Sequence, residues 1–148
     1  MSIRYQGAAA VKGRNLWGNY SIPEDNPYVD DKDLLPEIWA MGFKDAWCCS
    51  FDAERPSYFL CGVAGQDMYD EVDIITRGGN YGWPMYEGRF LSDVGKSQQG
   101  NISLDSTRPV FPVMGYNHSE VRDSAASIIG GYFYRSKTDP CLYGRCLC

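Results

Sequence analysis

The sequence predicts an all-β antiparallel fold, and three observations lead to that class. Short apolar runs rich in β-branched and aromatic residues recur along the chain, with turn signals between them. Glycine supplies 16 of the 148 residues and aromatic residues make up 14%, a composition typical of short strands joined by tight turns. Helical periodicity is absent, and Gly and Pro interrupt most windows, so long helices are not expected.

Composition and charge exclude several classes of protein. A hydrophobic content of 44% and a charged content of 22% predict one globular domain with a core, not a disordered chain. The formal net charge of −5 argues against a nucleic-acid partner, which requires a basic face. No apolar run is long enough to span a membrane. The N-terminus lacks the apolar core of a signal peptide.

Cysteines and glycosylation sequons favour an oxidising compartment. The chain has six cysteines, Cys48, Cys49, Cys61, Cys141, Cys146 and Cys148, and three N-x-S/T sequons, at Asn19, Asn101 and Asn117. The sequons are either glycosylation sites or coincidences of composition. Together the two features predict a secreted or cell-surface parent protein, whose signal peptide would precede this chain.

The N-terminal third is mostly loop. Residues 1–14 are unpatterned, and residues 16–29 are rich in turn signals. The acidic run EDNPYVDDKD at 24–33 is either a solvated loop or a cation contact. Residues 35–41, LPEIWAM, predict a short strand that enters the core.

Residues 47–63 predict a β-hairpin with a disulfide across it. The runs WCCSF and YFLCGV flank a polar loop. If Cys49 lies opposite Cys61, then Trp47 faces Val63 and Phe51 faces Phe59, all on one side of the hairpin. Directly opposed residues are close enough for a disulfide, so we expect a Cys49–Cys61 bond. Two buried free thiols are the alternative.

The remaining residues predict further strands and turns. We expect a strand at 71–76, a glycine turn at 78–84, and a polar surface excursion over 88–108. An extended edge segment follows at 109–116, then a polar loop at 117–126 that contains His118, read as a surface loop residue. Residues 127–135 predict a strong strand, before a final turn and strand. The glycine pairs at 78–79 and 130–131 lie 52 residues apart, a spacing that would suit blade-sized repeats.

Several motifs together carry a family resemblance. They are PEIWAMG at 36–42, SFD at 50–52, GQ at 65–66, EVD at 71–73 and GGNYGWP at 78–84. With these motifs the sequence resembles the glucose/sorbosone dehydrogenase family, and within it the plant type of the hedgehog-interacting-protein-like branch. The resemblance implies a six-bladed β-propeller, of which residues 15–148 would supply two to three blades. Alone, such a piece is expected to be marginally stable or to aggregate, because neighbouring blades would bury its open faces.

The resemblance also implies a chemistry. Quinoprotein members use pyrroloquinoline quinone (PQQ) to take a hydride from the anomeric carbon of a sugar, with a histidine as base and calcium polarising the quinone. Their G-x-R-N-P motif falls on residues 42–46, where Lys44 replaces Arg, Asp45 replaces Asn and Ala46 replaces Pro. Lys44 and Asp45 are therefore the candidate catalytic residues, although Lys loses the planar fork of Arg. An exposed turn pair without a catalytic role is the alternative.

The calcium contacts implied by the resemblance lie in and after the second hairpin strand. Gly65 and Gln66 match the carbonyl pair that faces the ion and the cofactor, and Glu71 matches an acid of a second, structural calcium site. Val63 stands where the branch more often has Asp. Glu71 is either a ligand or a solvated strand-end carboxylate. The family's base would lie upstream of this chain and its cofactor-holding lysine beyond Cys148.

Three hypotheses about function follow from the resemblance. The first is a secreted, PQQ- and calcium-dependent sugar dehydrogenase domain acting on a sugar. The second is a propeller that binds a protein or glycan ligand without catalysis. The third, favoured for the activity of this chain, is an inactive piece, because Lys44, Asp45 and Val63 all depart from working quinone chemistry.

Overall fold

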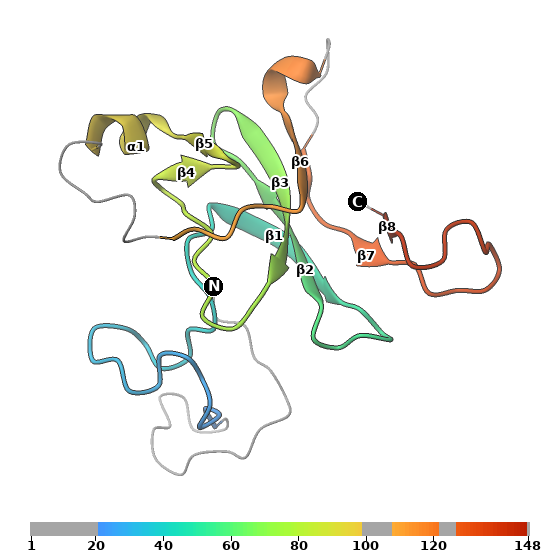
Figure 1. Ribbon diagram of the computed structural model, residues 1–148, viewed down its shortest axis with the longest axis horizontal. Helices are drawn as coiled ribbons and strands as arrows, with labels where there is room; N and C mark the ends of the chain where they lie inside the picture. Colours follow the sequence, from blue (N-terminus) through green and yellow to red (C-terminus); the bar gives the residue numbers. More distant parts are fainter. Residues whose placement is uncertain (1–20, 99–107, 122–126, 148) are drawn as a thin grey trace.

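The computed structural model describes residues 21–98, 108–121 and 127–147 of the chain (Figure 1). The strands are β1 (Asp45–Phe51), β2 (Phe59–Ala64), β3 (Tyr69–Ile75), β4 (Tyr86–Glu87), β5 (Phe90–Leu91), β6 (Met114–Asn117), β7 (Tyr132–Phe133) and β8 (Cys146–Leu147). The helical elements of the described part are α1 (Asp93–Gln98) and the 3-10 helix η2 (His118–Glu120). The predicted all-β class is therefore confirmed, and no described helix has the length and apolarity needed to cross a bilayer.

A four-stranded antiparallel sheet in the order β1-β2-β3-β6 forms the centre of the described chain (Figure 1). Four antiparallel strands are the unit of a propeller blade. The smaller sheets β4–β5 and β7–β8 have two strands each. β6 is the predicted edge strand, and it pairs with β3 from Tyr69↔Asn117 to Val72↔Met114.

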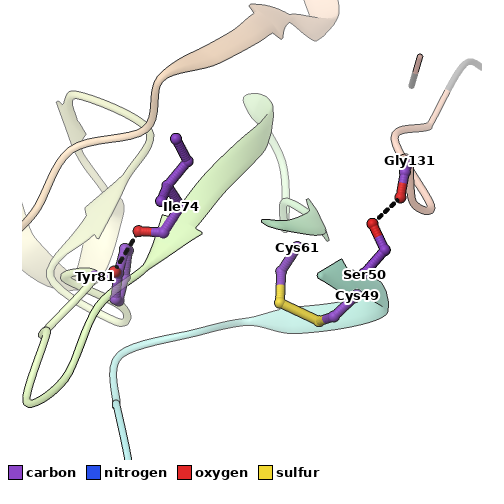
Figure 2. Close-up of a disulfide and its surroundings, with 6 residues drawn as sticks. All are labelled: Cys49, Ser50, Cys61, Ile74, Tyr81 and Gly131. Carbon is purple, nitrogen blue, oxygen red and sulfur yellow. Dashed lines mark hydrogen bonds between the residues drawn. A yellow bond between two sulfur atoms is a disulfide. The ribbon is translucent and has the colours of Figure 1, made fainter. Parts of the chain in front are cut away.

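The β1–β2 hairpin has the predicted register at its cysteines. Cys49 pairs with Cys61 and Phe51 with Phe59, and the Cys49–Cys61 disulfide is present (Figure 2). The predicted opposition of Trp47 and Val63 is wrong, because the register shifts between Ala46 and Cys48. A bulge of this kind leaves one residue out of the ladder, and Trp47 is accordingly 70% exposed.

The sheet buries apolar side chains on both of its faces. Side chains alternate along a strand and paired residues share a face, so the register defines two sets. The Cys61 face carries Phe59, Cys61, Val63, Glu71, Asp73 and Ile75, and the Asp70 face carries Leu60, Gly62, Asp70, Val72 and Ile74. On the Cys61 face the buried core also includes Ala40 and Tyr81.

The segment over the Cys61 face is not the strand predicted at residues 35–41. Its ladder contact is a single parallel bridge, Met41↔Asn80. The Met41 amide donates to the Gly79 carbonyl and the Met41 carbonyl accepts from the Tyr81 amide, both at 2.9 Å. The segment at 35–41 is therefore bonded to the glycine turn. Because a turn is not extended, it cannot pair with the segment over a longer ladder.

The glycine turn at residues 78–84 has the predicted role of reversing the chain. Gly78 and Gly82 have φ of 71° and 93°, a backbone region that L side chains rarely occupy. The turn brings Tyr81 back onto β3, where its hydroxyl donates to the Ile74 carbonyl at 2.7 Å (Figure 2). The same hydroxyl accepts from the Thr76 amide at 2.8 Å, so one phenol satisfies two backbone groups at the end of β3.

The Asp70 face is covered by residues 128–131. Ser50 Oγ donates to the Gly131 carbonyl at 2.7 Å (Figure 2). A Cβ on Gly62 would lie 2.6 Å from the Gly130 amide nitrogen, so the two backbones meet at a distance that only glycine permits. The strand predicted over 127–135 is consequently short: residues 128–131 pack across the sheet, and Tyr132–Phe133 alone pair, with β8.

The excursion predicted over 88–108 contains more structure than expected in its described part. It contains β5, which pairs with β4 just before the excursion, and continues into α1. Ser92 Oγ accepts the Gly95 amide at 3.0 Å, in the manner of a helix N-cap. A hydrophobic pattern does not reveal a helix of this length, since it spans fewer than two turns.

A buried ion pair joins the C-terminal hairpin to the β1–β2 hairpin. Arg135 donates to both carboxylate oxygens of Asp52, with Nε at 2.8 Å from Oδ1, and Asp52 is 1% exposed. The guanidinium also lies 5.5 Å from the ring centroid of Tyr143. The hydrogen bond from Arg135 lowers the pKa of Asp52 to about 2, against the opposing effect of burial.

Removal of the disulfide should destabilise the protein. Replacing both Cys49 and Cys61 by Ala opens a cross-link over 12 residues of sequence, and the chain-entropy model gives a loss of about 3 kcal/mol. The measurement is the free energy of unfolding in denaturant without reductant. The matched control is Cys48→Ser, at the exposed neighbouring thiol, which should leave stability unchanged. Equal losses in both variants would contradict this prediction.

The Asp52–Arg135 pair should stabilise the fold in a pH-dependent way. The pKa of Asp52 is lowered on folding, so its contribution is present above about pH 4 and is lost as the pH falls toward 2. Arg135→Met should therefore lower the melting temperature at pH 6 and do so progressively less between pH 4 and 2. Lys96→Met, at an exposed ion pair, should change it by little at either pH. A deficit for Arg135→Met that does not vary with pH would contradict the linkage.

Candidate functional site

Residues 65–68 connect β2 to β3 and are called the rim loop below. Its backbone donors are held by two acidic side chains. Glu87 Oε1 accepts the amides of Asp67, Met68 and Tyr69 at 2.9, 2.7 and 3.0 Å, and Asp70 Oδ1 accepts the Gly65 amide at 2.9 Å. Of the five amides from Gly65 to Tyr69, all but that of Gln66 thus donate to a carboxylate, which fixes the path of the loop.

Gly65 occupies the tightest position of the rim loop. A Cβ there would lie 2.0 Å from the Tyr69 carbonyl oxygen and 2.5 Å from Glu87 Oε1. The presence of glycine at this position therefore has a steric cause, namely the close approach of β3 and Glu87. Gln66, the second predicted calcium and cofactor contact, is exposed.

Asp70 is a buried carboxylate with four donors. Gly65 donates to Oδ1, and the Tyr116 hydroxyl and the Ile128 amide donate to Oδ2, each at 2.9 Å. His118 Nε2 lies 2.9 Å from Oδ1. Burial alone would raise the pKa of Asp70, but His118 and the other donors together lower it below its usual value. Asp70 is therefore an ionised hub that joins the rim loop, β6 and the segment over its face.

Glu71 and Asp73 lie on the opposite face of β3 and lack such donors. Both are buried, at 8% and 1% exposure. Glu71 Oε2 and both oxygens of Asp73 have no hydrogen-bond partner among the described residues, whereas the backbone of Gly88 supplies a hydrogen bond to Glu71. Burial raises the pKa of Glu71 to about 7, and burial with the neighbouring Glu71 raises that of Asp73 to about 8. The pair holds a proton at neutral pH in place of a second negative charge.

The carboxyl oxygens of Glu71 and Asp73 are suitable ligands for a hard cation, because they are buried and most of them lack a hydrogen-bond donor. Calcium takes oxygen ligands from carboxylates and backbone carbonyls. Three buried carboxyl oxygens of this pair have no hydrogen-bond partner among the described residues. No cluster of three His, Cys, Asp or Glu side chains in ligand geometry exists among residues 21–98, 108–121 and 127–147. Any ion at Glu71 and Asp73 would therefore complete its shell with backbone carbonyls or water.

Lys44 and Asp45, the predicted catalytic residues, form an ion pair with each other. The Lys44 side chain is 23% exposed and that of Asp45 51%. Lys44 Nζ also lies 6.0 Å from the ring centroid of Trp83. The ammonium charge is thus balanced by its own neighbour in sequence. Val63 occupies the position at which the family branch more often has Asp. Its side chain is buried in the core on the Cys61 face.

The structure brings some predicted residues together and separates others. Gly65 and Gln66 share the rim loop, whereas Glu71 belongs to the Cys61 face beyond it. Of the sequons, Asn117 ends β6 and its Oδ1 accepts the Ser119 amide at 2.9 Å. Asn19 and Asn101 lie outside the described residues, and glycosylation of all three stays a prediction.

Three buried acids at the site, Asp70, Asp73 and Glu87, were not predicted from the sequence. For the first two a signal exists, because an apolar strand written YDEVDII places acids on both faces of a buried segment. Glu87 carries no such signal, since its partners lie some 20 residues earlier. His118, read as a surface loop residue, is instead bonded to buried Asp70.

Asp73→Asn should stabilise the protein at alkaline pH in the presence of a chelator. The raised pKa values mean that folding retains protons, so stability falls as the pH rises from about 4 through about 8. The amide removes one buried charge and offers Glu71 a donor, which should increase the free energy of unfolding at pH 8.5 by about 1–3 kcal/mol. At pH 5 the gain should vanish. A variant equally or less stable than wild type at pH 8.5 would show that the pair has another partner.

Comparison with known proteins places this chain in a family. The model of the family described as Glucose / Sorbosone dehydrogenase matches residues 12–147. The HIPL1 protein of Arabidopsis thaliana is 60% identical over 140 residues, which is 93% of this chain and 20% of that protein. The HIPL2 protein of the same plant is 58% identical over 131 residues, 87% of this chain and 19% of that protein. The chain thus spans about a fifth of the length of these relatives.

The fold agrees with solved structures of sugar dehydrogenases. The soluble aldose sugar dehydrogenase of Escherichia coli, in its apo form, superposes with a TM-score of 0.62 at 24% identity, over 83% of this chain and 33% of that one. The predicted partial β-propeller is thereby confirmed as the fold, with β1-β2-β3-β6 as its complete four-stranded sheet. By its sequence match along nearly the whole length, the chain belongs to the glucose/sorbosone dehydrogenase family.

Proposed function

We propose that this segment forms the calcium-binding part of a secreted, sugar-oxidising propeller of the quinoprotein type. The observation that carries the proposal is the Glu71–Asp73 pair, with three buried carboxyl oxygens that have no donor among the described residues. A divalent cation would take the place of the proton that the pair holds and would balance the charge of both carboxylates. Family membership supplies the substrate class, since relatives of similar fold are aldose sugar dehydrogenases.

The rim loop supports the same proposal from the other side of β3. Its amides at residues 65 and 67–69 are bonded to Asp70 and Glu87. The Gly65 and Gln66 carbonyls would contribute oxygens to the calcium ion beside the cofactor. When bound there, calcium would supply the positive charge that polarises a quinone carbonyl. The loop is held by Asp70 of β3 and Glu87 of β4, so this part of the site would not need the ion in order to form.

The cofactor half of the site does not fit PQQ in this segment. A cofactor with three carboxylates needs unpaired positive side chains, whereas the charge of Lys44 is balanced by Asp45. The histidine of this chain, His118, is engaged with Asp70 and the Asp67 carbonyl. No step of hydride transfer therefore follows from the residues described. Any such step would depend on other parts of a longer protein.

The Lys44–Asp45 pair favours a second candidate function. In a propeller that keeps the ion site but has lost the cofactor site, the blade would serve to bind a glycan or a protein ligand. The disulfide, which requires an oxidising compartment, and the three sequons support a secreted or cell-surface location for either function.

Calcium binding tests the proposal directly. In the full-length protein that contains this segment, calcium should raise the melting temperature, and Glu71→Gln or Asp73→Asn should reduce that rise by more than half. Asp93→Asn, at an exposed acid in α1, is the matched control and should leave the rise intact. The same melting temperature with calcium and with chelator would refute the ion site.

Dye reduction with an aldose separates the two candidate functions. After reconstitution with PQQ and calcium, sugar-dependent turnover would support the dehydrogenase. Binding of calcium without turnover would favour the non-catalytic propeller. In the latter case the double change Lys44→Arg and Asp45→Asn should introduce turnover if the remaining site is intact.

A further inference from the structure

His118 occupies an unusual position for the single histidine of the chain. It begins η2, directly after β6, and its backbone amide donates to the Met68 carbonyl of the rim loop at 2.8 Å. Its ring reaches the same region: Nδ1 lies 3.2 Å from the Asp67 carbonyl oxygen and Nε2 lies 2.9 Å from Asp70 Oδ1. The side chain is 34% exposed, so protons can reach it from solvent.

Both ring nitrogens of His118 face acceptors. A backbone carbonyl cannot donate, and the Asp70 carboxylate is ionised because its pKa is lowered by its donors against the effect of burial. Neutral imidazole has one N–H and satisfies one of these contacts, whereas imidazolium satisfies both. The hydrogen bond to Asp70 accordingly raises the pKa of His118, with smaller contributions from Asp67 and Glu87.

The contacts of His118 complete a three-point attachment of the rim loop. Glu87 holds the loop amides from the β4 side, and Asp70 holds the Gly65 amide from β3. His118 holds the Asp67 carbonyl from the end of β6. Among the described residues, the ring contacts Asp67 and Asp70, interacts electrostatically with Glu87, and has the Tyr116 ring centroid 6.1 Å away. Glu87 and Asp70 hold the loop as hydrogen-bond acceptors. His118 is the attachment whose number of N–H donors changes near neutral pH, because imidazole gains a proton there.

We propose that His118 is a proton-operated clamp on the rim loop, which closes the loop onto β3 and β6 when its imidazole is protonated and loosens it when the imidazole is neutral. The inference rests on the geometry of the loop and not on calcium or PQQ, so it stands or falls separately from the function proposed above. Since the folded pKa is raised, the clamp is complete below about pH 6.5 and is lost as the pH rises through the folded pKa. The consequence is a rim loop whose order depends on the pH of its compartment.

Amide hydrogen exchange of the full-length protein, kept in chelator, tests the clamp. Protection factors of the Asp67 and Met68 amides, corrected for the intrinsic pH dependence of exchange, should fall about ten-fold when the histidine deprotonates, the effect of losing one hydrogen bond to a charged group. In His118→Gln they should be low and independent of pH. Glu120→Gln, which alters a neighbouring exposed acid in η2, is the matched control and should keep the wild-type profile.

Ring nitrogen shifts of His118 provide a readout that needs no variant. In the wild-type protein both nitrogens should carry protons at pH 6, and their titration midpoint should coincide with the midpoint of the exchange profile. Loop protection that does not change across this titration would overturn the proposal, as would a wild-type profile retained in His118→Gln.

Discussion

The described structure depends on one constraint: β3 is a central strand whose two faces are both buried, and it carries acids on each. Period-two alternation sends Asp70 to one face and Glu71 and Asp73 to the other. On the first face four donors converge and the carboxylate stays ionised. On the second face donors are missing and the pair retains a proton. Neighbouring residues of one strand thus have different charge states: Asp70 is ionised, whereas the Glu71–Asp73 pair retains a proton. The difference follows from how many hydrogen-bond donors the surrounding loops and turns place on each face.

Much of the fold was predictable because it follows from local patterns. The Cys49–Cys61 pairing follows from alternation in two short apolar runs, and the glycine turn follows from positions that only glycine occupies easily. The bulge at Trp47 was not predictable, since it depends on how β1 leaves the sheet. Nor was the short length of β7, because the pattern of an apolar strand is the same whether it pairs or packs across a face.

The site was predictable only in part, and for a related reason. Gly65, Gln66 and Glu71 came from a family pattern, which records which residue types occupy a position but not what they contact. The attachment of the rim loop joins residues about 20 and 50 positions apart, as in Glu87 to Asp67 and His118 to Asp70. No period or spacing signals such contacts. From the sequence alone, His118 is therefore interpreted as a solvated loop residue, because its contact with Asp70 of β3 is visible only in the structure.

The contact of Gly62 with Gly130 sets an order of assembly. β1, β2 and β3 are contiguous in sequence and their pairing needs no later residue, so this meander can form as soon as it leaves the ribosome. The Asp70 face then stays uncovered until residues 128–131 have been synthesised and reach it. During that interval Asp70 lacks the Ile128 donor, and water can solvate the carboxylate in its place. Asp70, which the folded structure buries, therefore leaves a polar group on this face for as long as the face is uncovered.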